Sequence, residues 1–298
     1  MNIVSRPRLK DRTRLKIGGR AQAEVRIEKP GDWDFLPDFL QREGLSPLVL
    51  GRGSNLLVQD GDLPLCLVVP KNIHRPEPRS ADQDRVVIRV PAGFPLPGLL
   101  RWLQRQGLSG LEGLTGIPAH VGGAVAMNAG SFGQCMGDCL YRVRCWSPRT
   151  GLIWLERKDV HCAYRTFRPH ELQGEWMIQE VELIFSRGKA SEVNSRMQRC
   201  LERKRQTQPV GERTCGCTFK NPEQAPAGLL LDHSGMRGKQ IGEVGFSDQH
   251  ANFLINRGNG TFTQAWELIH EAQNKVMTRY GVDLELEVQL IGPQGNWT

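Results

Sequence analysis

Residues 110–131 have the composition of a segment that contacts a phosphate-bearing ligand. The run holds six glycines and no Lys or Arg, and Glu112 is its only acidic residue. Each interior glycine costs a helix roughly 0.5–1 kcal/mol relative to Ala, so we expect no core helix in this run. Successive backbone N–H groups in turns form concavities that bind anions, and small side chains let a flat ring system lie against the main chain. The alternative is a glycine-rich surface loop.

A second glycine motif, at residues 51–58, directly follows a buried strand that we expect at residues 47–50. It reads Gly-Arg-Gly-Ser-Asn-Leu-Leu-Val. The backbone around Gly51 and Gly53 offers another phosphate cradle, to which Ser54 and Asn55 add side-chain hydrogen bonds. The same motif also fits an ordinary β-turn between two strands.

The chain has the composition of an ordinary globular protein. Its 298 residues, 39% hydrophobic and 24% charged, suffice for two or three compact units. The formal net charge of +7 suits an anionic partner. Because the basic residues are spread along the chain with little aromatic interleaving, we expect a phosphate-bearing small molecule rather than a nucleic acid. No stretch approaches the roughly 18 apolar residues of a membrane span, so we expect no membrane partner.

The cysteines are interpreted as free thiols. The first residues lack the apolar segment of a signal peptide, so we place the protein in the cytoplasm, where disulfides are rare. Two pairs stand close together in the sequence, Cys135 with Cys139 and Cys215 with Cys217. Neither pair has the Cys-x2-Cys spacing that is usual in zinc sites, and we therefore assign no metal.

Short strands and helices are expected on either side of the main glycine run. One helix is expected at residues 32–45, capped by Asp32, and another runs from Leu96 to Gly107. Before the run, strands are expected at residues 24–28, 47–50, 65–69 and 86–90, the last two around a polar, Pro-containing loop.

Beyond the run the pattern predicts sheet and then helix. Strands are expected at residues 141–146, 152–155 and 177–185, and helices at residues 191–205, 229–232 and 263–280. Gly281 should end the last helix. Residues 284–290 alternate between Leu or Val and Glu or Gln, which predicts a final strand with Glu287 on its polar face.

Six motifs occur in an order and spacing that resemble one known family. They are residues 51–58, 116–130, Tyr164-Arg165, 219–222, 250–253 and 284–288. Over residues 13–292 the chain resembles the UDP-N-acetylenolpyruvoylglucosamine reductases, flavoenzymes that make UDP-N-acetylmuramate for peptidoglycan. The resemblance implies an α+β fold with two FAD-binding subdomains of the vanillyl-alcohol oxidase type, at residues 1–70 and 71–206. An α+β substrate-binding domain would follow at residues 207–298.

The resemblance also implies a cofactor and a reductant. FAD would be bound without a covalent link, since the first cradle offers no His or Cys for attachment, and NADPH would reduce it. The residues that match the family's FAD contacts are Gly51, Arg52, Gly53, Ser54, Asn55, Leu56, Gly116, Ile117, Pro118, Gly122, Gly123, Ala124, Asn128, Ala129 and Gly130.

In that family, hydride passes from flavin N5 to C3 of the enolpyruvyl ether while an enzyme acid protonates C2. Arg165 and Glu287 match the residues that would stabilise the enolate. Cys217 stands where the family usually has serine, and a thiol preserves a proton donor at that position. The residues implied in substrate binding are Tyr164, Lys220 and Asn221.

Two other functions fit part of the sequence. A flavin oxidase or dehydrogenase of the same cofactor fold would explain both glycine motifs, but neither Lys220-Asn221-Pro222 nor Glu287. A basic nucleic-acid binder would explain the net charge and would be colourless. For the reductase, we expect a UDP-sugar as partner, no nucleic acid, and a monomer that acts in cytoplasmic peptidoglycan precursor synthesis.

Overall fold

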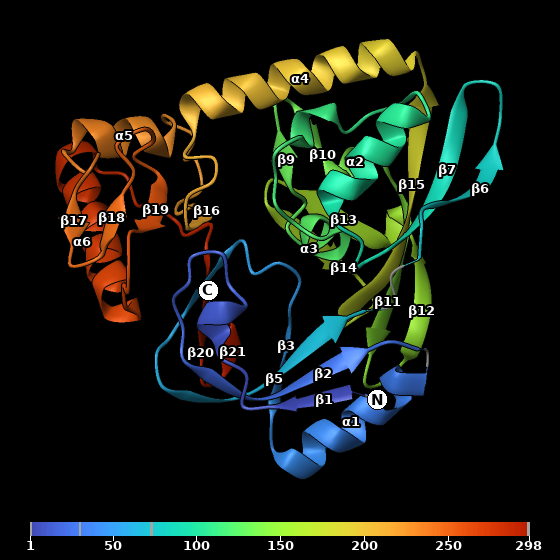
Figure 1. Ribbon diagram of the computed structural model, residues 1–298, viewed down its shortest axis with the longest axis horizontal. Helices are drawn as coiled ribbons and strands as arrows, with labels where there is room; N and C mark the ends of the chain where they lie inside the picture. Colours follow the sequence, from blue (N-terminus) through green and yellow to red (C-terminus); the bar gives the residue numbers. More distant parts are fainter. Residues whose placement is uncertain (1, 30, 72–73, 297–298) are drawn as a thin grey trace.

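The N-terminal unit is a four-stranded sheet covered by one helix (Figure 1). The computed structural model describes residues 2–29, 31–71 and 74–296. The strand order is β1 (Asn2–Ser5), β2 (Arg20–Ile27), β5 (Asp62–Pro70) and β3 (Ser46–Val49), and β2, β5 and β3 run parallel. Trp33, Leu36 and Phe39 of α1 (Gly31–Glu43) are buried against this sheet.

Two details of this unit differ from the sequence expectation. β3 was expected to be a buried strand, but it is buried only at Leu48, whereas Val49 is 40% exposed and lines a cavity. Asp32 lies inside α1, which begins one residue earlier, so it is not the helix cap. Its carboxylate instead accepts hydrogen bonds from the backbone N–H groups of Glu28 and Lys29.

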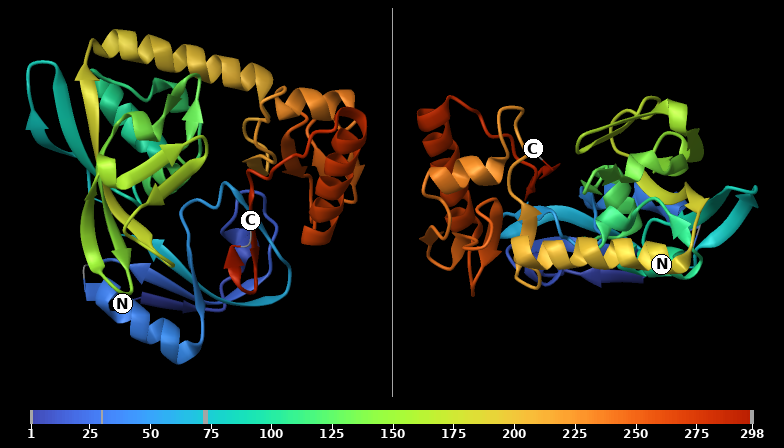
Figure 2. Two further views of the ribbon diagram at one scale, coloured as in Figure 1. Left: turned by 180° about the vertical axis from the view of Figure 1, so that it is seen from behind. Right: turned by 90° about the horizontal axis from the view of Figure 1, so that it is seen from above.

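The middle unit is built on an antiparallel sheet (Figures 1 and 2). Its strands lie in the order β12 (Gly151–Glu156), β11 (Leu140–Ser147), β15 (Met177–Arg187), β7 (Arg85–Pro91) and β6 (Glu77–Ala81), and β8 (Leu108–Ser109) also pairs with β15. The leucines of α2 (Leu96–Arg105) are buried in its core, as the helical spacing predicts. The loop expected between residues 69 and 86 contains β6, because its backbone pairs with β7.

Short elements complete the middle unit. Two hairpins extend from it, β9 (Gly130–Ser131) with β10 (Gln134–Cys135), and β13 (Val160–Ala163) with β14 (Thr166–Pro169). The 3-10 helices in the described chain are η1 (Leu9–Asp11), η2 (Glu112–Leu114), η3 (Met136–Asp138) and η4 (Arg157–Asp159).

The glycine run contains a short helix, α3 (Val121–Ala126), so the expectation of no helix is wrong here. The reason is close packing. A Cβ added to Gly122 would lie 2.6 Å from the Cβ atom of Ala92, closer than real side chains approach. Gly122 therefore lets this helix press against the segment after β7, and that contact offsets the helical cost of glycine.

The C-terminal unit is joined to the middle unit by α4 (Ala190–Thr207), which runs along the top of Figure 1. Its sheet has the order β16 (Thr214–Cys217), β19 (Phe253–Asn256), β18 (Val244–Phe246) and β17 (Gln240–Ile241). The helices are α5 (Ala227–His233) and α6 (Phe262–Tyr280). Gly281, with a φ of 66°, ends α6 as expected.

The last segment of the chain returns to the N-terminal unit. β20 (Gln289–Gly292) pairs in parallel with β4 (Leu56–Val58) and in antiparallel with β21 (Gly295–Asn296). The expected strand at residues 284–290 is therefore mostly wrong, because only its last two residues belong to β20. The alternation still predicts burial correctly, since Leu284, Val288 and Leu290 are almost fully buried.

All eight cysteines are free, as expected. Among the described residues, no group of three or more His, Cys, Asp or Glu side chains could hold a metal ion. Within the same ranges, no helix is both long enough and apolar enough to cross a membrane. The division at residues 1–70, 71–206 and 207–298 stays a prediction.

Candidate active site

A cavity of about 760 Å³ is lined by segments of all three units. Both glycine motifs contribute to its wall, together with residues from the turn between β13 and β14, from β16, and from the segment before β20. The predicted site residues that line it are Gly51, Arg52, Gly53, Ser54, Asn55, Leu56, Gly116, Ile117, Pro118, Gly122, Gly123, Ala124, Ala129, Gly130, Arg165, Cys217 and Glu287. Segments more than 200 residues apart in the sequence thus meet at one cavity.

Arg165 and Glu287 form an ion pair inside this cavity. Arg165 Nε donates to Glu287 Oε1 at 2.6 Å, and the side chains are 18% and 12% exposed. Arg165 has a φ of 52°, in the left-handed region that non-glycine residues rarely adopt, and it lies in the tight turn between β13 and β14. A further guanidinium N–H donates to the carbonyl oxygen of Gly130 at 3.3 Å. The pair is therefore fixed in position before any ligand binds.

The backbone of Glu287 is held from two sides. Its N–H donates to the carbonyl oxygen of Thr218 at 2.9 Å, and its carbonyl oxygen accepts from the Asn55 side-chain amide at 2.9 Å. Asn55 belongs to the first glycine motif and Thr218 follows Cys217, so one short segment couples the cradle to β16. Burial raises the pKa of Glu287, although Arg165 and then Lys220 oppose the shift.

Cys217 is half-buried at the end of β16 and lines the cavity. Burial, and then the nearby Glu287 carboxylate, raise the pKa of its thiol to about 12, against the opposing charge of Arg165. The thiol is consequently protonated throughout the physiological pH range. It is also a weaker acid here than an ordinary cysteine. We call Arg165, Cys217 and Glu287 the reacting region.

A second group of basic residues, two arginines and a histidine, lines the cavity near the first glycine motif. Burial, and then the charge of Arg52, lower the pKa of Arg14, and the buried Arg14 Nε has no hydrogen-bond partner among the described residues. His120 is close by, since a Cβ added to Gly51 would lie 3.4 Å from its side chain. Burial, then Arg52 and Lys71, lower the pKa of His120 to about 4, so the imidazole is neutral. We call Arg14, Arg52 and His120 the cation region.

Asn128 is the predicted cofactor contact that does not line the cavity. It is buried, with a φ of 39°. Its side-chain amide donates to the carbonyl oxygen of Ala163 at 2.7 Å, and its side-chain oxygen accepts from the backbone of Gly137 at 2.8 Å. In the structure it joins the glycine run to the hairpin that carries Arg165.

The predicted substrate-binding residues also lie outside the cavity lining. They are nevertheless near one another. The Tyr164 hydroxyl accepts a hydrogen bond from the backbone of Asn221 at 3.3 Å, and Lys220 forms an ion pair with Glu285 at 3.0 Å. The Asn221 side chain accepts from the backbone of Ala227 at the start of α5. Their role in substrate binding stays a prediction.

Comparison with known proteins gives consistent results over the whole chain. A family model described as "FAD binding domain" matches residues 22–156, and one described as "UDP-N-acetylenolpyruvoylglucosamine reductase, C-terminal domain" matches residues 208–291. The chain is 47% identical to the UDP-N-acetylenolpyruvoylglucosamine reductase of Oleidesulfovibrio alaskensis, over 97% of each chain. It is 43% identical to that of Nitratidesulfovibrio vulgaris, over 98% of this chain and 99% of the relative. This chain belongs to the UDP-N-acetylenolpyruvoylglucosamine reductase family.

A solved structure supports the same assignment. The crystal structure of UDP-N-acetylenolpyruvylglucosamine reductase from Thermus caldophilus is similar with a TM-score of 0.80 and 32% identity, covering 97% of this chain and 99% of that one. The predicted fold class, the flavin cofactor FAD and the oxidoreductase class of this reductase family member are thereby confirmed.

The cavity of this reductase family member suits FAD. A Cβ added to Gly123, which lines the cavity, would meet no atom of the described residues within 4 Å, so a larger side chain would project into the open cavity. Gly53 and Gly116, with φ of 55° and 91°, keep backbone in conformations that expose N–H groups. The unpartnered Arg14 Nε offers a further donor to a phosphate.

Two charged residues that line the cavity of this reductase, Arg14 and Lys204, were not predicted as site residues from the sequence. Arg14 lies in an unremarkable basic N-terminal stretch, where no spacing sets it apart. Lys204 could have been found, because it continues the inward face that Val193, Met197 and Leu201 define on α4. His120, from the glycine run, also lines the cavity. The first cradle itself contains no His or Cys, but His120 packs beside Gly51.

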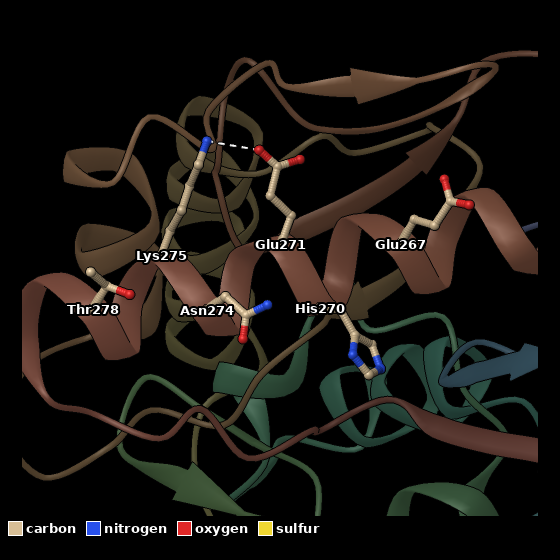
Figure 3. A pocket seen from close by; sticks show the side chains of 6 residues that line it. All are labelled: Glu267, His270, Glu271, Asn274, Lys275 and Thr278. Atoms are coloured by element: carbon tan, nitrogen blue, oxygen red, sulfur yellow. Dashed lines mark ion pairs between the residues drawn. The ribbon is translucent and has the colours of Figure 1, made fainter.

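A second hollow, on the face of α6, has none of these features. It measures about 570 Å³ and is lined by polar residues of that helix alone (Figure 3). Its Lys275 pairs with Glu271 at 2.8 Å. We assign it no role, because one exposed helix face supplies no converging groups.

Proposed function

We propose that this protein reduces the enolpyruvyl ether of UDP-N-acetylenolpyruvoylglucosamine to UDP-N-acetylmuramate. The observation that supports this most is the ion pair between Arg165 and Glu287, 2.6 Å long, in the same cavity as the Cys217 thiol. Bound FAD, once reduced by NADPH, supplies the hydride to C3 of the substrate. The protein must then bear the negative charge that develops and supply one proton to C2.

Arg165 is suited to the developing charge. Its guanidinium stays protonated, because Glu287 raises its pKa against the effect of burial. The hydrogen bonds to Glu287 and to the Gly130 carbonyl oxygen fix the plane of the group, and the remaining N–H groups are left for the carboxylate of an enolate. The orientation is set before the reaction, so no reorganisation is needed at the transition state.

Cys217 is suited to the proton transfer. Its S–H bond breaks as the C2–H bond forms, and the electron pair left on sulfur makes a thiolate. Arg165 lowers the pKa of the thiol and thus stabilises that thiolate, whereas Glu287 and burial disfavour it. The thiolate is therefore short-lived, and it regains a proton from water before the next turnover. Glu287 assists at the enolate by holding Arg165 through the ion pair, and the burial that raises its pKa favours uptake of a proton by its carboxylate when negative charge develops beside it.

The experiment that tests the proposal is anaerobic addition of UDP-N-acetylenolpyruvoylglucosamine to the reduced, FAD-loaded protein. We expect the absorbance of oxidised flavin to return. A flavin that stays reduced with this substrate, but is reoxidised by another acceptor, would favour an oxidase or dehydrogenase of the same fold. NADPH and NADH are compared in the preceding reduction step.

The remaining properties follow from the same proposal. We infer that FAD is bound without a covalent link, although His120 lies beside Gly51. Acid precipitation should release the yellow colour into the supernatant, and colour in the pellet would contradict this.

We also propose that the protein is a monomer that acts in peptidoglycan precursor synthesis in the cytoplasm, with the three-part division of the chain given above. Light scattering of the purified holoprotein tests the monomer.

A further inference from the structure

Helix α4 presents two basic side chains to the first part of the glycine run. Arg196 and Lys204 are eight residues apart, just over two helical turns. Arg196 binds Glu112 through two guanidinium nitrogens, at 2.9 and 2.8 Å from Oε1. Glu112 is itself buried, and hydrogen bonds from Gly110, Arg196 and Ser109 outweigh burial and lower its pKa to about 2. The positive charge of Arg196 is thus balanced inside the protein.

The charge of Lys204 is not balanced in this way. Its side chain is buried, with the residue only 4% exposed, and it forms no ion pair with any carboxylate among the described residues. Lys204 Nζ donates to the carbonyl oxygens of Gly113 at 3.1 Å and Thr115 at 2.8 Å. An ammonium group has three N–H donors, so one is left. Buried lysines are rare unless they are paired, and this one lines the cavity.

The position of Lys204 relates it to the reacting region. The hairpin of β9 and β10 touches both groups, since the Gly130 carbonyl oxygen accepts from Arg165 and the Phe132 ring lies 5.4 Å from Lys204 Nζ. On its other side Lys204 packs beside Gly116, where an added Cβ would lie 3.3 Å from its Cδ. Arg165 is also close enough to lower the pKa of Lys204, after burial, and only Cys200 acts in the opposite direction.

We propose that Lys204 is the counter-ion of reduced FAD, and that its third N–H pairs with the pyrimidine edge of the isoalloxazine ring. This rests on the FAD-binding part of the proposed function. Two-electron reduction leaves negative charge on that edge of the ring, whereas the oxidised ring is neutral. A cation fixed by two carbonyl oxygens would therefore favour the reduced form selectively. The diphosphate has other cations available, because Arg14 and Arg52 line the wall beside the first glycine motif.

The test measures the midpoint potential of the FAD-loaded protein and its affinity for oxidised FAD, both without substrate. Lys204→Met removes the charge and keeps much of the side-chain length. We expect the preference for reduced over oxidised flavin to fall about 10- to 100-fold, which lowers the two-electron potential by ~30–60 mV. The Kd for oxidised FAD should change less than threefold. In Lys204→Arg, which keeps the charge, the preference for reduced over oxidised flavin should stay within about twofold of wild type.

Two further variants keep the test decisive. Arg203→Met removes one exposed charge from the neighbouring position on α4 and should leave the potential unchanged, which controls for net charge. Lys204→Gln retains one donor for the loop carbonyls, and it replaces Lys204→Met if that variant does not hold FAD. It should show the same fall in potential, because it also lacks the charge.

Three results would overturn the inference. An unchanged potential would do so at once. An equal loss of affinity for oxidised and reduced FAD would place Lys204 at the diphosphate instead. A raised KM for the UDP-sugar with an unchanged potential would place it at a substrate anion. Because the potential is measured without substrate, a fall in Lys204→Met together with no reduction of the UDP-sugar by wild type would leave this inference standing and refute only the proposed substrate.

Discussion

The reacting region and the cation region of the cavity differ in how their charges are balanced. Arg165 contacts Glu287 at 2.6 Å, so each compensates the other. Arg14 and Arg52 form no ion pair with any described residue, and Arg52, after burial, lowers the pKa of Arg14. A cation that already has a partner suits a negative charge that exists only during the reaction, because the empty site then holds no uncompensated buried charge. Unpaired cations suit a ligand whose negative charge is permanent, such as a diphosphate.

The largest effect is expected from Cys217 in the reacting region. Cys217→Ala removes the side-chain acid, so reduction of the flavin by NADPH should persist while reoxidation by substrate slows by 10²- to 10⁴-fold. Stopped-flow absorbance of the two half-reactions measures both rates. Cys217→Ser should recover much of the loss, since a hydroxyl also carries a proton. Reoxidation at the wild-type rate in Cys217→Ala would assign the proton to another group or to water.

The ion pair should come next. Arg165→Lys keeps the charge but cannot hold Glu287 and the Gly130 carbonyl oxygen in one plane, so we expect reoxidation to slow by about 10²-fold. Glu287→Gln removes the negative charge that compensates Arg165 and the carboxylate that could take up a proton, and it should act on the same half-reaction. Single-turnover traces with NADPH and with substrate separate the steps. If Glu287→Gln slowed both half-reactions equally, the pair would serve flavin or nicotinamide binding rather than the enolate.

Sequence reasoning found those features whose signals are local. The two glycine motifs, the helices at Leu96 and Thr263, and the end of α6 at Gly281 follow from spacing and from glycine's conformational freedom. Glu287 was expected on the polar face of a strand, and in the structure it lines the cavity. Its backbone bonds to Thr218 and to the Asn55 side chain rather than to a neighbouring strand.

The rest depends on contacts between distant segments. The helical spacing of α4 places Lys204 on the inward face, but no local pattern predicts that it reaches Gly113, 91 positions earlier. Asn128 was matched to FAD by its motif, yet its side chain holds Ala163 and Gly137. An asparagine in a glycine-rich loop can bond either to a ligand or to a second loop. Its residue type does not distinguish the two cases.

In the cation region, Arg14→Gln should weaken binding of oxidised FAD by about tenfold, because one charge-assisted hydrogen bond contributes roughly 1.5 kcal/mol. At saturating FAD the half-reactions should be near wild type. Fluorescence titration of the apoprotein gives the affinity, and Arg203→Gln, which removes an exposed charge, is the control. An unchanged affinity with a slowed reoxidation would mean that Arg14 acts on the substrate instead.

The smallest effect concerns His120 and the pH dependence of stability. Burial, then Arg52 and Lys71, lower the pKa of His120 to about 4 from an ordinary 6.5. Between these pH values the unfolded chain binds a proton that the folded apoprotein does not. The free energy of unfolding should therefore decrease as the pH is lowered from 6.5 toward 4. A phosphate bound beside His120 would raise its pKa toward the ordinary value and so reduce this decrease.

Urea unfolding of the apoprotein and the holoprotein at several pH values in this range tests the idea. His120→Gln cannot take up the proton, so the difference between wild type and this variant isolates the histidine from the carboxylates that titrate in the same range. We expect that difference to depend on pH in the apoprotein and to flatten once FAD is bound. Equal pH dependence with and without FAD would show that the diphosphate does not lie beside His120, and would leave Arg14 and Arg52 as cations for a different anion.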